Sequence, residues 1–285
     1  MAWWKKDTRV LIVGLGLMGG SYARALKKHG FHITAVTADQ SAVDYAVGQG
    51  IIDRGYTEVC AEAVSDADAV IFAVYPGVLL PWIEANQHLF KSGVKITDVT
   101  GVKACLIYDI QRILREDAEF IGAHPMAGKE TSGVESSDER IFAKANYIVV
   151  PTQKNTPEGI AWCRELGTLL GVRKISELSP EEHDEMIGFV SQLTHCIAVC
   201  LMTCKENEHL VDYTGDSFHD LTRIARINDQ MWSELFMLNR TALLTQMDLF
   251  MKEFQDLRAM LEAGDVEGMR RKMQLSTKRR SLFDR

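Results

Sequence analysis

A glycine-rich turn near the start of the chain constrains the fold more than any other feature. It reads Gly14-Leu-Gly-Leu-Met-Gly19 and lies between a predicted strand, Thr8–Val13, and a predicted helix, Met18–Lys28. In this setting glycines permit a tight turn, the close approach of a pyrophosphate and close packing of helix on strand. Free N–H groups at the start of the helix attract an anion. The turn therefore predicts a dinucleotide site at Gly14, Leu15, Gly16, Leu17, Met18 and Gly19.

The alternation of strand and helix continues to about residue 150. Short β-branched runs without polar alternation are separated by helical segments, which is typical of a parallel sheet covered on both faces. Right-handed crossovers then give a doubly wound α/β fold of the Rossmann type. The further strands are predicted at His32–Val36, Ala69–Val74, Val94–Asp98, Glu119–Ala123 and Asn146–Val150.

The pattern changes after Pro151. The segment Pro151–Pro157 is rich in turn residues, and strand signals nearly vanish beyond it. Met186–Cys204 is apolar almost all round, which predicts a buried helix. An apolar seam runs from Leu243 to Leu261 along a long helix that should stop at Gly264. We therefore predict a Rossmann domain at residues 1–152 and an all-α helical domain at 153–285 that also forms a homodimer.

Composition and charge exclude several classes of protein. With 46% hydrophobic and 25% charged residues, the chain is not disordered. Its net charge of −7 argues against a nucleic-acid partner, and the basic segment 269–285 is interpreted as a solvated helix end. Glycines interrupt the run Val10–Gly20 and polar residues interrupt Met186–Met202. Neither a signal peptide nor a membrane span is therefore predicted, and a cytoplasmic location is expected.

The cysteines predict neither a disulfide framework nor a metal site. There are six, without a CxxC pair. Cys196, Cys200 and Cys204 share one face of a predicted helix, but they span about 12 Å, which is too far for one metal ion. They are interpreted as small core residues, and no bound metal is expected.

The end of the second strand leaves the choice of dinucleotide open. An acid there would hold the ribose of NAD, but the strand ends at Thr37, and Asp39 follows two residues later. No Arg or Lys stands there to receive the phosphate of NADP. NAD is favoured, and NADP is not excluded. Residues that follow the strands complete the predicted cofactor contacts: Thr37, Val74, Tyr75 and Thr100.

A histidine follows a later strand, at the edge where open α/β sheets bind ligands. His124 lies in Gly122-Ala-His-Pro-Met-Ala-Gly128, a loop fixed by Pro125 and glycines. A histidine in this place can take the proton of a hydroxyl as hydride leaves the carbon that bears it. The alternative is a histidine that serves only the structure of the loop.

Polar residues also interrupt the predicted helices of the second half. Ser191 and His195 are four residues apart and share a helix face, where His195 is either a ligand contact or a core histidine with a hydrogen-bond partner. Arg223 is flanked by apolar residues. If it points inward, it suits a carboxylate, which it can hold with two hydrogen bonds. The alternative is an ion pair with Asp220 or Asp229.

These segments together resemble the prephenate dehydrogenase family over almost the whole chain. The most specific are Gly122–Gly128 and Thr222-Arg-Ile-Ala225. The resemblance implies a Rossmann domain, a helical dimerisation domain, and oxidative decarboxylation of prephenate to 4-hydroxyphenylpyruvate. The other matching segments are Gly14–Gly19, Asp98–Lys103, Glu130, Ser132, Gly133, Ser179-Pro-Glu-Glu-His-Asp184, Ser191-Gln-Leu-Thr-His195 and Met231-Trp232.

The resemblance also implies roles for single residues. His124 would accept the proton of the substrate hydroxyl, and His195 and Arg223 would hold substrate carboxylate. Ser191 would be a further contact, and Glu130 would gate or screen the site. Many relatives have Ser where this chain has Gly101, and Thr100 beside it is the candidate substitute.

Three other functions are open on the sequence. Arogenate dehydrogenase has the same chemistry on a substrate with an amino group in place of the side-chain keto group. Another hydroxyacid dehydrogenase would need a catalytic Lys on a second-domain helix, where Lys205 lies at the far end. A non-catalytic nucleotide sensor would be expected to lack His124, His195 and Arg223.

Overall fold

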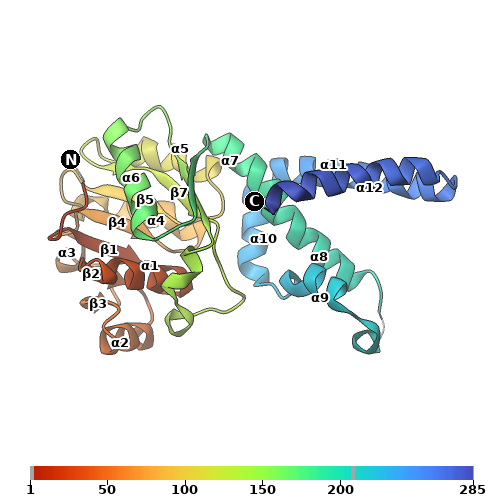
Figure 1. Cartoon of the computed structure of the whole chain (residues 1–285). Coiled ribbons are helices and arrows are strands. Elements are labelled where there is room, and N and C mark those ends of the chain that lie inside the picture. Colours follow the sequence, from red (N-terminus) through yellow and green to blue (C-terminus); the bar gives the residue numbers. More distant parts are fainter. Residues whose placement is uncertain (1–2, 207–208, 285) are drawn as a thin grey trace. The chain divides into compact units, whose positions relative to one another are not determined.

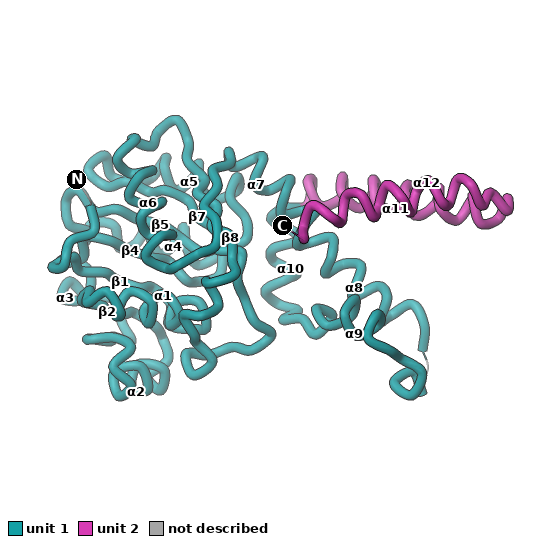
Figure 2. The backbone as a smooth tube through the Cα atoms, in the orientation of Figure 1, with its two compact units in different colours: residues 1–239 teal, residues 240–285 magenta. Residues whose placement is uncertain are grey.

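The computed structural model describes residues 3–206 and 209–284. The chain forms two compact units, residues 1–239 and residues 240–285 (Figure 2). The first unit contains all the described strands and the helices α1 to α10 (Figure 1). The second unit consists of two helices and a short terminal 3-10 turn.

The first unit is built on a parallel sheet of six strands in the order β3-β2-β1-β4-β5-β6. Its order reverses between β1 and β4, which is the switch point where folds of this class bind ligands. The predicted doubly wound Rossmann-type sheet is thereby confirmed. The strands are β1 Arg9–Val13, β2 His32–Val36, β3 Arg54–Tyr56, β4 Ala69–Phe72, β5 Lys95–Asp98 and β6 Glu119–Phe120. The helices between them are α1 Leu17–Lys28, α2 Gln40–Gly48, α3 Ala61–Val64, α4 Pro76–Asn86 and α5 Ala104–Ile113.

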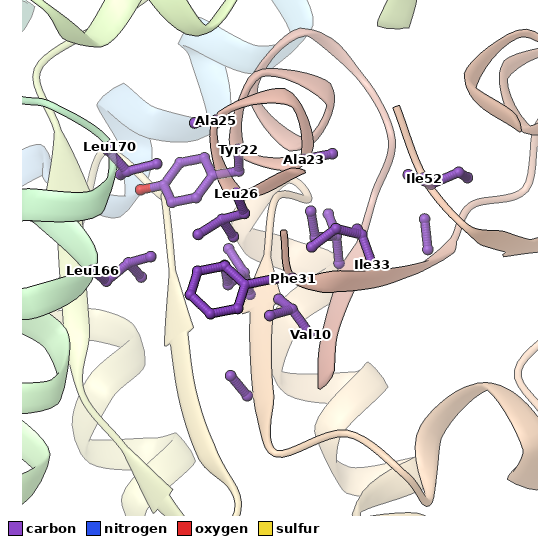
Figure 3. Close-up of a cluster of buried hydrophobic side chains, with 14 of the residues drawn as sticks. Val10, Tyr22, Ala23, Ala25, Leu26, Phe31, Ile33, Ile52, Leu166 and Leu170 are labelled. Atoms are coloured by element: carbon purple, nitrogen blue, oxygen red, sulfur yellow. The ribbon is translucent and has the colours of Figure 1, made fainter. Parts of the chain in front are cut away.

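Both faces of this sheet are covered, which explains why its strands lack polar alternation. In β1, Val10 and Ile12 belong to one buried hydrophobic cluster, and Leu11 and Val13 belong to the other. Figure 3 shows part of the first cluster, where side chains from α1 and α6 meet those of β1 and β2. Burial on both faces is the ordinary reason for a continuous apolar strand.

The strand predicted at Glu119–Ala123 is wrong in one respect, because the chain changes sheet within it. Ile121 N still donates to Ile96 O of the large sheet (2.9 Å). From Gly122 onward the chain pairs antiparallel with the next strand and forms a second sheet in the order β7-β8-β9. Its strands are β7 Gly122–Pro125, β8 Asn146–Val150 and β9 Lys174–Glu177. The change of sheet carries His124 away from the core of the parallel sheet.

The residues after Pro151 are not purely helical. Helix α6, Pro157–Leu169, contributes Leu166 to the first hydrophobic cluster (Figure 3), and β9 pairs parallel with β8. The predicted domain division after residue 152 stays a prediction. It would separate β9 from β8, the strand with which β9 pairs. The weak strand signal has a physical reason, since β9 is short and only half-buried.

Four further helices complete the first unit: α7 Pro180–Ile187, α8 Leu193–Thr203, α9 Asp216–Thr222 and α10 Asp229–Leu238. A capping box starts α7, in which Ser179 and Glu182 satisfy each other's backbone N–H groups. A π-helical turn, Gly188–Gln192, joins α7 to α8, and such turns are frequent at functional sites.

The long apolar helical stretch is less buried than the sequence predicts. Phe189 is 56% exposed, and Val190 and Met202 are exposed as well. By length and composition alone the stretch Pro180–Thr203 could cross a membrane: its best window has a mean hydropathy of 1.6 and is 28% buried. Core helices of soluble proteins pass the same test, so this is weak evidence for a membrane span.

The second unit is a helical hairpin of α11, Arg240–Glu262, and α12, Val266–Arg280. Gly264 has a φ of 68° between them, which confirms the predicted stop of the long helix. Asp265 caps α12 by accepting from Gly268 N (2.8 Å), and Lys272 pairs with Glu253 across the hairpin (2.6 Å). Large apolar side chains, Phe254 and Leu261 among them, are exposed.

Candidate active site

The turn after β1 requires glycine at two positions. Gly14 has a φ of +91°, and a Cβ there would lie 2.4 Å from Ala73 O. A Cβ on Gly19 would lie 1.9 Å from Gly14 O, so only glycine allows α1 to start this close to the strand. Gly14 N also donates to Val36 O (2.8 Å), which ties the turn to β2.

Gly16 is different, because the space at its Cβ position is open. No described heavy atom outside its own neighbours lies within 4 Å of that position. Gly16 is the N-cap of α1, and no side chain within residues 3–206 and 209–284 caps this helix. The first N–H groups of α1 therefore lie beside open space at the switch point of the sheet. This arrangement fits the pyrophosphate of a dinucleotide.

The acidic side chain nearest the end of β2 serves as a helix cap. Thr37 N donates to Tyr56 O (3.0 Å) of the neighbouring strand. Asp39 caps α2 instead: its carboxylate accepts from Ser41 N (2.9 Å) and Ser41 Oγ (2.7 Å). The hydrogen bond from the Ser41 side chain is the main reason that the pKa of Asp39 is lowered.

Helix α10 lies over the carboxyl end of β4, where Val74 and Tyr75 precede α4. Gly77 N, in the first turn of α4, donates to Glu234 Oε1 of α10 (2.6 Å). Leu235 of the same helix is buried, and its side chain is 3.6 Å from the Cβ position of Gly101. The helical half of the unit thus closes over the edge of the sheet that carries the glycine turn.

His124 lies on β7 at this edge and is tied to α7. Its Nδ1 is 2.9 Å from Nε2 of His183, and His183 Nδ1 is 2.8 Å from Asp184 Oδ1. Burial, followed by the neighbouring His183 and Lys103, holds the pKa of His124 well below its ordinary value. His124 is therefore neutral at pH 7, which is the state that a proton acceptor needs.

Thr100 belongs to a buried polar cluster beneath His124. Its hydroxyl lies within hydrogen-bond distance of Asp98 and of Val102 O (2.9 Å), and it accepts from Lys103 Nζ (3.1 Å). Lys103 Nζ also donates to Asp98 Oδ2 (2.6 Å), and both side chains are almost completely buried. The Thr100 hydroxyl is thus occupied by internal partners, and its predicted contacts to substrate and cofactor stay predictions.

His195 stacks on an aromatic ring at the start of α8. Its ring centroid is 3.7 Å from that of Trp232, and its Nδ1 donates to Ser191 O (2.9 Å). Burial is the main reason that the pKa of His195 is lowered. Ser191 thus contacts His195 through its backbone carbonyl, inside the π-helical turn.

Arg223 is not directed inward as the flanking apolar residues suggested, since its side chain is 65% exposed. Its ion-pair partner is Glu130 from the loop after β7, not Asp220 or Asp229. Both members of this pair act electrostatically on His195, so the three side chains are neighbours. The structure therefore brings Ser191, His195, Arg223 and Glu130 together.

We call Ser191, His195, Arg223 and Glu130 the outer group. Contacts along helix α10 connect it with His124. Trp232 stacks on His195, and Leu235, one turn further along, packs on Gly101. The Gly101 Cβ position is also 3.9 Å from His124 Cε1. Contacts along α10 therefore link His195 to the strand end that carries Gly101 and His124.

The sequence interpretation missed several residues of this site: His183, Asp184, Lys103, Trp232 and Glu234. The adjacent His183 and Asp184 lie in a segment that the resemblance includes, but nothing in the local pattern says that they are buried. The one signal in the sequence is that a histidine and an aspartate are adjacent in a predicted helical segment, and it says nothing about burial.

Two family models match the chain. That of the prephenate dehydrogenase nucleotide-binding domain matches residues 22–176, and that of the dimerization domain matches residues 179–275. Prephenate dehydrogenase of Bacillus subtilis is 32% identical over 93% of this chain and 72% of its own length. Cyclohexadienyl dehydrogenase of Zymomonas mobilis is 29% identical over 90% and 89%.

The solved structures give the same result. Prephenate dehydrogenase from Aquifex aeolicus, in complex with hydroxyphenyl propionate and NAD+, has a TM-score of 0.89 and 28% identity, and covers 97% of this chain and 98% of its own. Arogenate dehydrogenase from Synechocystis, with a TM-score of 0.83 and 23% identity over 97% and 100%, shows the shared fold. This chain belongs to the prephenate dehydrogenase family.

Proposed function

We propose that this protein catalyses the oxidative decarboxylation of prephenate to 4-hydroxyphenylpyruvate with NAD as cofactor. The observation that carries the proposal is a histidine, His124, which is held by His183 at the sheet edge that bears the glycine turn. The B. subtilis relative named prephenate dehydrogenase and the A. aeolicus structure with NAD+ support the substrate and the cofactor.

When bound, NAD would supply the acceptor for the hydride of the ring carbon that bears the hydroxyl. His124 Nε2 takes the proton of that hydroxyl as this carbon is oxidised, and the oxygen gains carbonyl character. As the bond to the ring carboxylate breaks and carbon dioxide leaves, its electron pair makes the ring aromatic, and the oxygen takes a proton back from His124 as the phenol of the product. A positioned general base contributes about 10²–10⁴ in rate. Thr100 holds Lys103 and the backbone below His124, because its hydroxyl is already bonded there.

Gly14 and Gly19 shape the turn that would hold the pyrophosphate, and Gly16 leaves room for it. Leu15, Leu17 and Met18 belong to the same turn and start of α1, while Thr37, Val74 and Tyr75 follow β2 and β4. We place NAD here, which the NAD+ in the A. aeolicus structure supports, and regard NADP as the alternative, since the acidic residue nearest the end of β2, Asp39, caps α2.

The two carboxylates of prephenate would be held by the outer group. Arg223 and His195 supply cationic and hydrogen-bonding groups, and Ser191 lies one helical turn before His195. In the structure the guanidinium group of Arg223 forms an ion pair with the carboxylate of Glu130. A substrate carboxylate would have to replace Glu130, so Glu130 would act as a gate in the loop after β7.

Replacing Arg223 with Ala should raise KM for prephenate at least about tenfold and change kcat less. A charge-assisted hydrogen bond contributes about 1.5–3 kcal/mol, and an interaction lost equally from ground and transition states appears in KM. Steady-state kinetics with varied prephenate would measure this. Arg226→Ala, which removes an exposed Arg three residues along, is the matched control and should leave KM within twofold. Equal KM values for Arg223→Ala and wild type would contradict the role of Arg223.

The helical domain would also form the homodimer. Exposed apolar side chains on α11 and α12 and the match to a dimerization-domain model support this. The predicted division at 1–152 and 153–285 is part of the proposal, as is a cytoplasmic location.

The experiment that tests the proposal compares prephenate and arogenate, each with NAD and with NADP. Prephenate with NAD should give the highest kcat/KM. Arogenate as the only substrate would make the protein an arogenate dehydrogenase, and a preference for NADP would correct the cofactor.

A further inference from the structure

A chain of hydrogen bonds runs from His124 into the interior and ends at the start of α5. His124 Nδ1 is 2.9 Å from His183 Nε2, and His183 Nδ1 is 2.8 Å from Asp184 Oδ1. The Asp184 carboxylate also accepts from Lys103 N (2.8 Å) and from Ala104 N (2.9 Å). His183 is completely buried, and Asp184 is nearly so.

This chain fixes which nitrogen of each ring carries a proton. A carboxylate can only accept, so His183 Nδ1 must donate to Asp184. In neutral His183, Nε2 is then an acceptor, and His124 Nδ1 must donate to it. In neutral His124 the remaining nitrogen, Nε2, carries a lone pair and no proton.

Other charges around the two rings act in both directions. Lys103, from the start of α5, lowers the pKa of both histidines, while Asp98 of β5 and Asp184 act to raise that of His183. Burial outweighs them and lowers both pKa values, so the two rings are neutral at pH 7. The direction of each hydrogen bond in the chain follows from these protonation states.

We propose that His183 and Asp184 are positioning residues that hold His124 in the tautomer with a bare Nε2 and stabilise the imidazolium formed when Nε2 takes a proton. The inference rests on the proposed function, because it needs His124 to be the proton acceptor. Asp184 compensates the new positive charge through His183, and the substrate O–H bond breaks as the Nε2–H bond forms.

Asp184→Asn should remove the negative charge that stabilises the imidazolium of His124. The Asp184 oxygen that accepts from His183 also accepts from Lys103 N, and the other oxygen accepts from Ala104 N. The amide NH₂ group of the variant therefore faces either Ala104 N or both His183 and Lys103 N, and in the second orientation His183 donates from Nε2 and His124 keeps its proton on Nε2. We expect kcat to fall at least about 100-fold, with KM for prephenate within threefold. Glu185→Gln, the same charge change on the next residue, which is exposed, should retain wild-type kinetics.

His183→Phe tests the same link without removing the cap that Asp184 gives to α5. It keeps an aromatic ring in the buried space and leaves His124 Nδ1 without its acceptor. We expect kcat to fall at least about tenfold. If Asp184→Asn does not fold, the kcat of His183→Phe tests the proposal. Activity within twofold of wild type in either folded variant would overturn the proposal.

Two readouts separate positioning from a general loss of structure. The ¹⁵N spectrum of selectively labelled histidines should show His124 Nε2 unprotonated in wild type at pH 8 and partly protonated in His183→Phe, where Nδ1 has lost its acceptor. The acid limb of kcat/KM should move to lower pH in Asp184→Asn, because the carboxylate no longer stabilises the imidazolium. A protonated His124 Nε2 in wild type would overturn the proposal. The spectrum needs no substrate, so it tests the hydrogen-bond chain even if prephenate is not turned over. Absence of turnover would refute the proposed function and not the positioning of His124.

Discussion

Replacing His124 with Asn is expected to lower kcat by about 10²–10⁴-fold, while NAD binding changes little. Asn can donate or accept a hydrogen bond, but it cannot take a proton near neutral pH, so the general-base contribution is lost. His124 lies on β7, whereas the glycine turn follows β1, and the cofactor site should therefore be unaffected. Steady-state kinetics and a separate titration of NAD binding would measure the two effects.

The matched control for this substitution is His88→Asn. His88 is exposed in the middle of a short 3-10 turn, and its replacement should leave kcat and NAD affinity within twofold. If His124→Asn retains more than a tenth of wild-type kcat, another group takes the proton and the assignment of the base is wrong.

Replacing Lys103 with Met is expected to lower the free energy of unfolding by about 3–5 kcal/mol. The ammonium group and the Asp98 carboxylate are almost completely buried, with Nζ 2.6 Å from Oδ2. Removing one member of a buried pair leaves the other charged and without its partner, which is strongly destabilising. Nζ also donates to Thr100 O (2.9 Å), so a second buried acceptor loses its donor. Urea denaturation followed by circular dichroism would measure the change.

Lys91→Met is the comparison for this prediction. Lys91 also pairs with an aspartate, Asp68, but its side chain is 51% exposed. An exposed pair contributes less than about 1 kcal/mol. Equal losses in Lys103→Met and Lys91→Met would show that burial does not set the strength of the Asp98–Lys103 pair.

The parallel sheet and the glycine turn could be predicted because their signals are local. Val10 to Val13 are all apolar since the sheet is covered on both faces, and Gly14 and Gly19 follow within one turn. The second sheet was missed because its pairing is not local. The residues near Gly122 do not indicate that the chain leaves the large sheet after β6 and pairs with β8.

The sequence names candidate residues for the site but not their contacts. His124, His195, Arg223 and Glu130 are such candidates, and the ion pair of Arg223 with Glu130 joins positions 93 residues apart. The link from His124 to His183 joins positions 59 apart. Such contacts depend on how α7 packs on β7 and how the turn after α9 meets the loop after β7, and no spacing rule carries that information.

Burial also changes the chemistry that a sequence pattern suggests. Thr100 was a candidate for the hydroxyl at the reacting centre, but Asp98 and Lys103 on either side of it form a buried pair that binds its side chain. Asp39, the acidic residue that follows the end of β2, caps α2. Short polar side chains near strand ends serve turns and caps as often as ligands.

The stoichiometry of the reaction tests the central claim most directly. Wild-type protein with prephenate and NAD should produce reduced nicotinamide, carbon dioxide and 4-hydroxyphenylpyruvate in equal amounts, and His124→Asn should form all three at least about a hundredfold more slowly. If no reduced nicotinamide forms with prephenate or with arogenate, using either NAD or NADP, the claim that this site oxidises and decarboxylates a cyclohexadienyl acid is contradicted.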